Sequence, residues 1–118
     1  MARPTIIEDV LPVAAGQLPS LYALRDAAEV ASYLRERPGT FADLAEIAKV
    51  VPEYFPDRAV TLAVLHDPEE PLVTLYVGIG ARGDARNART QLDLFDSEWW
   101  FPNSVDMDPD LCVSLDYS

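Results

Sequence analysis

The chain has 118 residues, of which 49% are hydrophobic and 25% charged, and its formal net charge is −11. This composition fits one compact domain, residues 1–118, and the charge excludes free attraction to nucleic acids or anionic membranes, which select basic surfaces. The single cysteine, Cys112, excludes an internal disulfide, and without a signal peptide or an apolar run of ~20 residues a cytoplasmic protein is expected.

The N-terminal part of the sequence predicts an irregular arm followed by a helix. Residues 1–19 contain three prolines and no regular hydrophobic period. Ser20 is a good N-cap, and residues 21–37 follow it with apolar side chains at three- and four-residue spacing. These apolar positions are Leu21, Leu24, Ala28, Ala31 and Leu34. The spacing predicts an amphipathic helix that ends at Pro38.

A second helix is predicted over residues 40–51. Thr40 opens it, and Asp43 stands at the third helical position, a weaker form of the capping box. Pro52 and Pro56 close it. Because the connection to the first helix is short, the two are expected to form a helical hairpin.

The hydrophobic period then changes to that of β-strands. Residues 58–66 and 72–79 alternate as strands around a turn, which predicts an antiparallel hairpin. A helix is expected from about Asp84, and residues 111–117 alternate as a final strand. A crossover through this helix would set the final strand parallel to the second and beside the first. The predicted fold is α+β: a helical hairpin followed by ββαβ, with a three-stranded, mainly antiparallel sheet.

The third helix carries two adjacent tryptophans at its end. Ala85, Ala88, Leu92, Phe95 and Trp99 recur at alternating spacings of three and four and predict a buried stripe. Trp100 lies ~100° further round an α-helix, where it is either covered by the helical hairpin or exposed at an interface. Phe101 follows it directly.

The segment Phe95-Asp96-Ser97-Glu98-Trp99-Trp100 resembles the FD-x-x-WW signature of a group of small uncharacterised bacterial proteins. The similarity covers about the C-terminal 65 residues. The resemblance implies a bacterial cytoplasmic protein and carries no catalytic role onto any residue.

Three glycines fit the G-x-G-x-x-G pattern between a strand and a helix. With Gly78, Gly80 and Gly83 at the turn, Arg82 and Arg86 could neutralise a pyrophosphate at the helix N-terminus. A ribose-binding acid is expected ~20 residues further on. The nearest acid that ends a strand, Asp116, is more than 30 residues beyond the turn. A structural turn is therefore favoured, with nucleotide or anion binding as the alternative.

The basic residues of this helix form one cluster. Arg82, Arg86 and Arg89 share one flank, with Asp93 next in line. Arginines at a helix N-terminus oppose its dipole, so local helix stability does not explain them. They are expected either to form a solvated face or to dock an acidic partner or anion.

Residues with catalytic or metal-binding chemistry are few. His66 ends a strand, Cys112 has no basic neighbour in sequence, and nothing pairs them as base and nucleophile. The alternating acids of residues 106–110 resemble half of a calcium loop. Leu111 and Tyr117 occupy the positions that require glycine and glutamate, so an acidic turn is expected. We expect no cofactor and no metal.

These features together predict a non-enzymatic, acidic protein-binding module, such as an antitoxin-like or immunity-like protein or a subunit of a complex. The expected partner is a protein, for which the negative field favours a basic one, or a second copy of the chain. The expected partner-binding residues are Trp100, Phe101, Arg82, Arg86 and Arg89. The alternative is a small ligand-binding or nucleotide-binding domain that uses the turn from Gly78 to Arg86.

Overall fold

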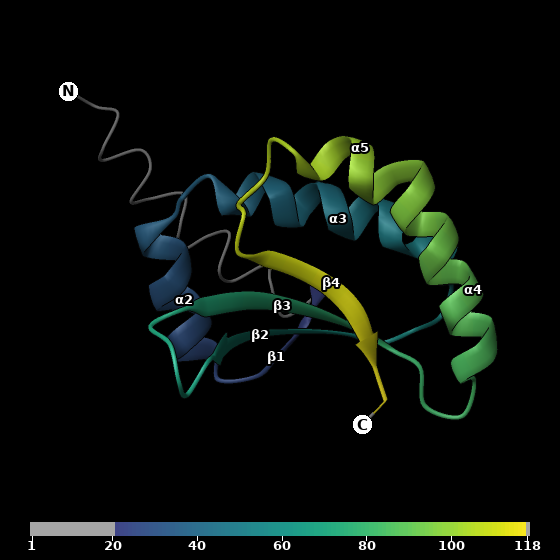
Figure 1. The fold of residues 1–118 in the computed structure, drawn as a ribbon, viewed down its shortest axis with the longest axis horizontal. Helices are drawn as coiled ribbons and strands as arrows, with labels where there is room; N and C mark the ends of the chain where they lie inside the picture. Colours follow the sequence, from purple (N-terminus) through teal and green to yellow (C-terminus); the bar gives the residue numbers. More distant parts are fainter. Residues whose placement is uncertain (1–20, 118) are drawn as a thin grey trace.

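The computed structural model describes residues 21–117 of the chain (Figure 1). A mixed sheet and a set of helices make up this part of the protein. The strands are β1 (Ala23–Leu24), β2 (Val60–His66), β3 (Val73–Gly80) and β4 (Leu111–Asp116). The helices are α2 (Ala27–Glu36), α3 (Thr40–Tyr54), α4 (Ala85–Phe95), the π-helical turn η1 (Asp96–Trp100) and α5 (Phe101–Ser104).

The four strands form one sheet in the order β1-β2-β3-β4. The antiparallel hairpin of β2 and β3 is confirmed, with a register from Val60 opposite Ile79 to His66 opposite Val73. β1 runs parallel to β2, and β4 runs parallel to β3. The α+β class is therefore correct, whereas the predicted three-stranded, mainly antiparallel sheet is wrong.

Two features explain the difference in the sheet. β1 has only two residues, too few to show an alternating pattern, and it pairs Ala23 with Thr61 and Leu24 with Leu62. The final strand is parallel to the second, as predicted, but it lies beside that strand rather than beside the first. The crossover through α4 thus returns the chain to the nearest free edge, consistent with the preference for short connections.

The predicted first helix is too long at its start. Residues 21–26 leave the helix because Ala23 and Leu24 bond to β2, and Tyr22 buries its ring and donates a hydrogen bond to the Leu44 carbonyl at 2.8 Å. The helix begins only at Ala27. Asp26 caps it in the left-handed conformation, accepting from the Glu29 amide at 3.2 Å. Tertiary pairing has overridden local helix propensity here.

The second predicted helix is confirmed over its length, and it continues through Pro52 to Tyr54. Its predicted capping box is wrong, because neither Thr40 nor Asp43 caps the helix. Both side chains instead bond to residues 106–110. Figure 1 also shows α2 and α3 diverging, so each packs its own face against the sheet and no packed helical hairpin forms.

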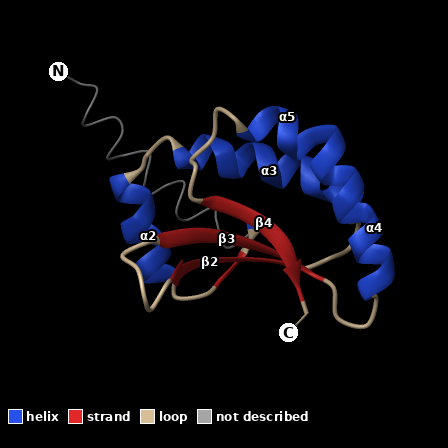
Figure 2. Ribbon diagram, viewed as in Figure 1, coloured by secondary structure: helices blue, strands red, loops and turns tan. Residues whose placement is uncertain are grey.

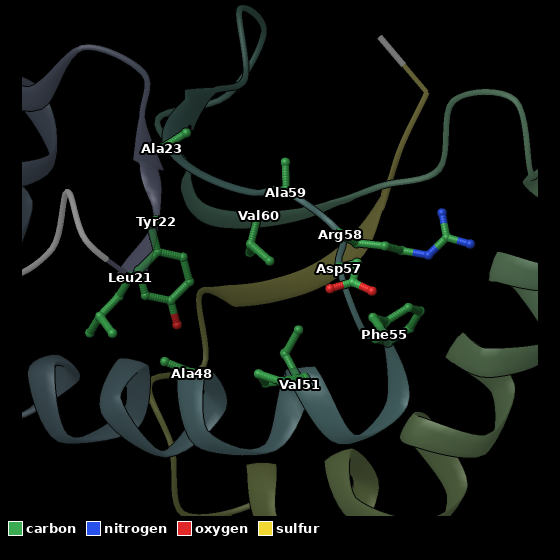
Figure 3. Close-up of a pocket in the computed structure, with 11 residues that line it drawn as sticks. Leu21, Tyr22, Ala23, Ala48, Val51, Phe55, Asp57, Arg58, Ala59 and Val60 are labelled. Carbon is green, nitrogen blue, oxygen red and sulfur yellow. The ribbon is translucent and has the colours of Figure 1, made fainter.

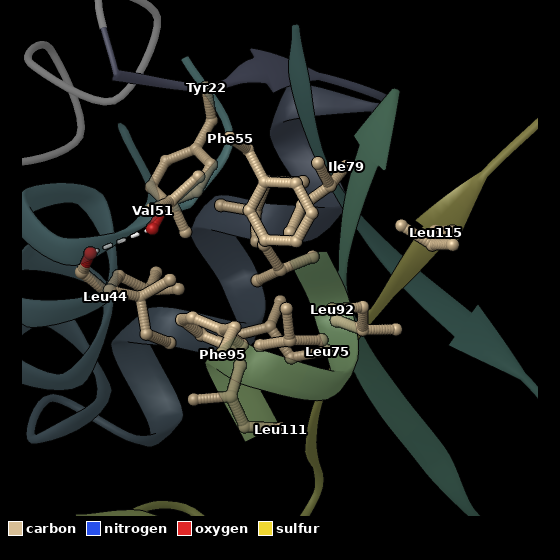
Figure 4. Close-up of a cluster of buried hydrophobic side chains, with 14 of the residues drawn as sticks. Tyr22, Leu44, Val51, Phe55, Leu75, Ile79, Leu92, Phe95, Leu111 and Leu115 are labelled. Atoms are coloured by element: carbon tan, nitrogen blue, oxygen red, sulfur yellow. Dashed lines mark hydrogen bonds between the residues drawn. The ribbon is translucent and has the colours of Figure 1, made fainter. Parts of the chain in front are cut away.

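The core lies between the sheet and the helices. In Figure 2, α3, α4 and α5 lie over one face of the sheet, while α2 packs at its end. Alternate strand residues meet the buried helix faces around Phe55 and Phe95 (Figure 4). The buried strand residues include Leu62, Val64, Leu75, Val77, Ile79, Leu111, Val113 and Leu115. Each large side chain buried there contributes about 1.5–3 kcal/mol to stability.

Two further predictions concern the N-terminal residues and membrane-spanning helices. The irregular arm predicted for residues 1–19 lies outside the described residues. Within residues 21–117, every helix is too short or too polar to cross a bilayer.

Candidate functional site

The tryptophan pair stands on a π-helical turn between α4 and α5. The turn is defined by a hydrogen bond from the Phe101 amide to the Asp96 carbonyl, five residues back. In an α-helix residue i+4 lies close to residue i, whereas residue i+5 points away. When a π-helical turn adds one residue, residues i+4 and i+5 come to lie on either side of residue i. Phe95 is therefore flanked by Trp99, at 5.6 Å between ring centroids, and by Trp100, at 6.3 Å and nearly parallel.

This geometry corrects the prediction for both tryptophans. Trp99 was expected in the core and Trp100 off the helix stripe, but both are half-buried and pack against the core through Phe95. The rest of the stripe is confirmed at Ala88, Leu92 and Phe95, all buried, while Ala85 is exposed.

Phe101, at the start of α5, and Val105, its C-terminal cap, are large hydrophobic residues that lie mostly in solvent. Phe101 is 62% exposed and Val105 is 77% exposed. They are four residues apart across α5, so they are neighbours on its surface, and exposed Pro102 lies between them in sequence. We call Phe101, Pro102 and Val105 the α5 patch.

An acidic loop follows the α5 patch and is tied to α2 and α3 through Asp108. The Asp108 side chain is only 5% exposed. One carboxylate oxygen accepts from the Tyr33 hydroxyl at 2.7 Å and from the Thr40 hydroxyl at 2.9 Å. The other accepts from Arg37 at 3.0 Å and from the Asp110 amide at 2.9 Å. A buried carboxylate with four donors is a structural anchor.

The charges in this network shift one another's titration. Burial would raise the pKa of Asp108, but the hydrogen bonds and the Arg37 charge outweigh burial and hold the pKa below its ordinary value. Burial and the neighbouring Asp108 raise the pKa of Tyr33. Arg37 also pairs with Asp110 at 2.6 Å and lies over the Tyr33 ring, 4.6 Å from its centroid.

A groove of about 540 Å³ lies beside this anchor. Its lining includes Asp43, Asp106, Asp108 and Asp110 but only one basic residue, Arg37. Four carboxylates against one guanidinium give the groove a formal charge of −3. The calcium-loop arrangement is absent, and within residues 21–117 no group of three or more His, Cys, Asp or Glu side chains is placed to hold a metal ion.

The three glycines of the G-x-G-x-x-G pattern each have a structural reason. A Cβ on Gly78 would lie 2.5 Å from the Tyr76 ring, and one on Gly80 would lie 3.2 Å from the Ala59 carbonyl oxygen. Gly83 has φ +81°, which favours glycine. Asp84 then precedes α4 and pairs with Arg58 at 2.6 Å. The Asp84 side chain makes no cap hydrogen bond to α4.

The arginine cluster does not join the aromatic residues in one site. Arg82, Arg86 and Arg89 are all exposed, and Arg89 lies 4.0 Å from Asp93. Arg86 is in the first turn of α4, so Phe101 lies roughly 20 Å further along the helical segment. The predicted partner-binding residues therefore form two separate surfaces.

His66 and Cys112 lie on different strands. His66 ends β2, and its Nε2 contacts the Glu29 carboxylate. Cys112 is exposed on β4, where partial desolvation and the nearby Asp96 charge raise the pKa of its thiol. A raised pKa makes the thiol a weaker nucleophile at neutral pH.

A second hollow, of about 340 Å³, lies between β1 and the C-terminal half of α3. Figure 3 shows that Tyr22, Ala48, Val51 and Val60 line it, while the Arg58 guanidinium points away. That guanidinium bonds to the Gly80 carbonyl at 2.9 Å and to Asp84. The hollow is thus lined mainly by apolar side chains, with the exposed carboxylate of Asp57 also in its lining.

Similarity to known proteins adds no information about a functional site. No family model matches the chain, and searches of curated proteins and of solved structures gave no match. The resemblance to the FD-x-x-WW group therefore stays a prediction.

Proposed function

We propose that this chain is a non-enzymatic module that binds a positively charged protein. The observation that carries the proposal is the position of the exposed α5 patch directly before the acidic groove. A cytoplasmic location belongs to the same proposal. Its narrower form is an antitoxin-like or immunity-like role, in which the chain covers a basic toxin. A subunit of a permanent complex is the other form.

The α5 patch supplies the apolar part of the proposed contact. Phe101 and Val105 expose most of their surface to solvent although the core lies one residue away, at Trp100. Protein interfaces are enriched in aromatic residues, including phenylalanine, and a few residues carry most of the binding free energy. Phe101 is the expected centre of the contact.

The groove supplies the electrostatic part. Asp106 follows Val105 in the chain and lines the groove with Asp43 and Asp110, so carboxylates border the apolar patch. A lysine or arginine of the partner could enter this groove while its apolar neighbours cover Phe101. Complementary charge of this kind raises the association rate and selects the partner more than it adds affinity.

The experiment compares partner capture by matched surface variants. Wild type, Phe101→Ser and Leu72→Ser would each be used to purify bound protein from the source cell. Leu72 is 58% exposed in the turn between β2 and β3, so it controls for the loss of any exposed apolar side chain. We expect wild type and Leu72→Ser to retain one basic protein that Phe101→Ser loses.

Two results would contradict the proposal. Equal capture by Phe101→Ser would remove the α5 patch from the interface. Light scattering that shows self-association of wild type but not of Phe101→Ser would identify a second copy of the chain as the occupant of the patch.

A further inference from the structure

The arginines of α4 and the α5 patch lie on the same face of one helical segment. In Figure 1 the ribbon runs without a break from α4 into α5. An α-helix completes a turn in about 3.6 residues, and the π-helical turn η1 adds one residue. When that added residue is set aside, Phe101 and Val105 follow Arg86 by about four and about five full turns. All three residues are exposed, so the two surfaces face the same side of the molecule.

The π-helical turn produces this alignment. In an unbroken α-helix, Val105 would lie roughly 100° away from Arg86 round the helix axis. The same added residue places Trp99 and Trp100 on either side of Phe95. The turn therefore rotates α5 relative to α4, so that the α5 patch continues the outer face on which the arginines lie.

The positive charges on this face have no explanation in local stability. Arg86 stands in the first turn of α4, where the helix dipole disfavours a cation. Within residues 21–117, it makes no ion pair. Arg89 lies 4.0 Å from Asp93, and because both side chains are mostly exposed, this pair adds little stability. By contrast, the exposed Arg35 stands in the last turn of α2, where the dipole favours it.

The order of charges along the face limits the partners that fit it. Arg86 and Arg89 lie at one end, whereas Asp106 follows Val105 at the other and lines the acidic groove. A partner surface that is basic throughout would be repelled by the arginines. A second copy in the antiparallel direction offers the right order of charges, but the net charge of −11 on each chain opposes association. A basic protein with one acidic site fits both ends.

We propose that a single partner covers the α5 patch and also places an acidic site against Arg86 and Arg89. This inference rests on the proposed function, because it concerns the same partner, and it adds the charge pattern that this partner carries. Its basic residues face the groove, and its acidic residues face the arginines about 20 Å away along the helical segment. The π-helical turn acquires a role, which is to align the two contacts.

Charge reversal in the capture experiment tests the proposal. Arg86→Glu puts an acid in the first turn of α4, where the dipole favours it, so the variant should melt no lower than wild type. We expect it to retain about tenfold less of the partner that Phe101→Ser loses, because like charges then oppose each other. Arg35→Glu is the matched control. It reverses another exposed arginine that makes no ion pair within residues 21–117, and it should retain the partner fully.

A cross-link identifies what lies over the arginines. Thr90 is exposed one turn after Arg86, so Thr90→p-benzoylphenylalanine carries a photoreactive ring on the same side of α4. After irradiation in the source cell, mass spectrometry should find the partner of the capture experiment joined to residue 90. The joined segment should contain more aspartate and glutamate than lysine and arginine.

Several results would overturn the shared contact. Full retention of the partner by Arg86→Glu would do so and leave the proposed function in place, because the loss caused by Phe101→Ser would stand. The absence of a cross-link, or a cross-link to a basic segment, to a different protein or to a second copy of the chain, would do the same. Retention of the partner by Phe101→Ser would instead remove the proposed function, and this inference with it.

Discussion

The loop around Asp108 and the α5 patch before it arrange polar and apolar side chains in opposite ways. Asp108 carries a charge and is nearly buried, with every contact supplied by the chain itself. Phe101 is aromatic and is 62% exposed, although a core lies beside it. A buried charge with a full set of donors indicates a structural anchor. An exposed aromatic residue that joins a second exposed apolar residue in one patch marks a candidate contact surface.

Among the variants considered, Asp108→Ala is expected to cause the largest loss of stability. The variant would leave the hydroxyl groups of Tyr33 and Thr40 and part of the Arg37 guanidinium without their acceptor. Each buried hydroxyl group left without its partner costs about 1–3 kcal/mol. Urea denaturation measures the loss. Asp106→Ala, which removes an exposed acid two residues away, is the control, and equal midpoints for the two variants would contradict the anchor.

Because the Asp108 carboxylate is ionised in the folded protein, the free energy of unfolding should depend on pH. Its folded pKa lies below the unfolded value, so the stabilisation is complete above the unfolded pKa and is lost as pH falls through the folded one. We expect wild type to lose more stability than Asp108→Asn between about pH 4 and pH 2, the range below the ordinary pKa of an aspartate. Thermal melts across this range measure the difference. Parallel curves would show that Asp108 does not titrate in this way.

Sequence patterns identified the elements but not the contacts that hold the loop. The hairpin of β2 and β3, helix α4 and strand β4 follow from their hydrophobic periods, which are strong local signals. The Asp108 anchor joins residues more than 60 positions apart, and no local pattern encodes that distance. Its only sequence signal was Asp43 at a capping position, which instead accepts from the Asp108 amide.

The candidate surfaces were predictable only in part. Phe101 was predicted to form part of an apolar edge that binds a partner; the ring is exposed, and partner binding stays a prediction. The π-helical turn was not predicted, because the pattern up to Trp99 fits an ordinary α-helix and the extra residue shows only as a hydrogen bond from Phe101 to Asp96. The neighbour of β4 was predicted wrongly, because the period of a strand does not encode which strand it pairs with.

Substitution of either tryptophan by alanine is expected to lower the stability of the fold by an intermediate amount. Both rings pack on Phe95 and both are half-buried, so Trp99→Ala and Trp100→Ala should each cost about 2 kcal/mol, less than the loss of a fully buried ring. An α-helix without the π turn would make only the first substitution costly. Chemical denaturation of the two variants compares them. A difference of more than ~1.5 kcal/mol would mean that the rings do not share Phe95 equally.

The smallest effect on stability is expected for the α5 patch itself. Phe101→Ser removes a side chain that is mostly in solvent, so the free energy of unfolding should change by no more than ~0.5 kcal/mol. Phe95→Ser, six residues earlier and fully buried, is the matched control and should cost about 3–5 kcal/mol. Urea denaturation of both variants gives the two values. If Phe101→Ser also lost more than ~1.5 kcal/mol, the ring would support the fold, and its loss of a partner in the capture experiment would reflect unfolding rather than contact. A stable Phe101→Ser variant that no longer retains the partner would show that the α5 patch serves partner contact, whereas the loop around Asp108 serves stability.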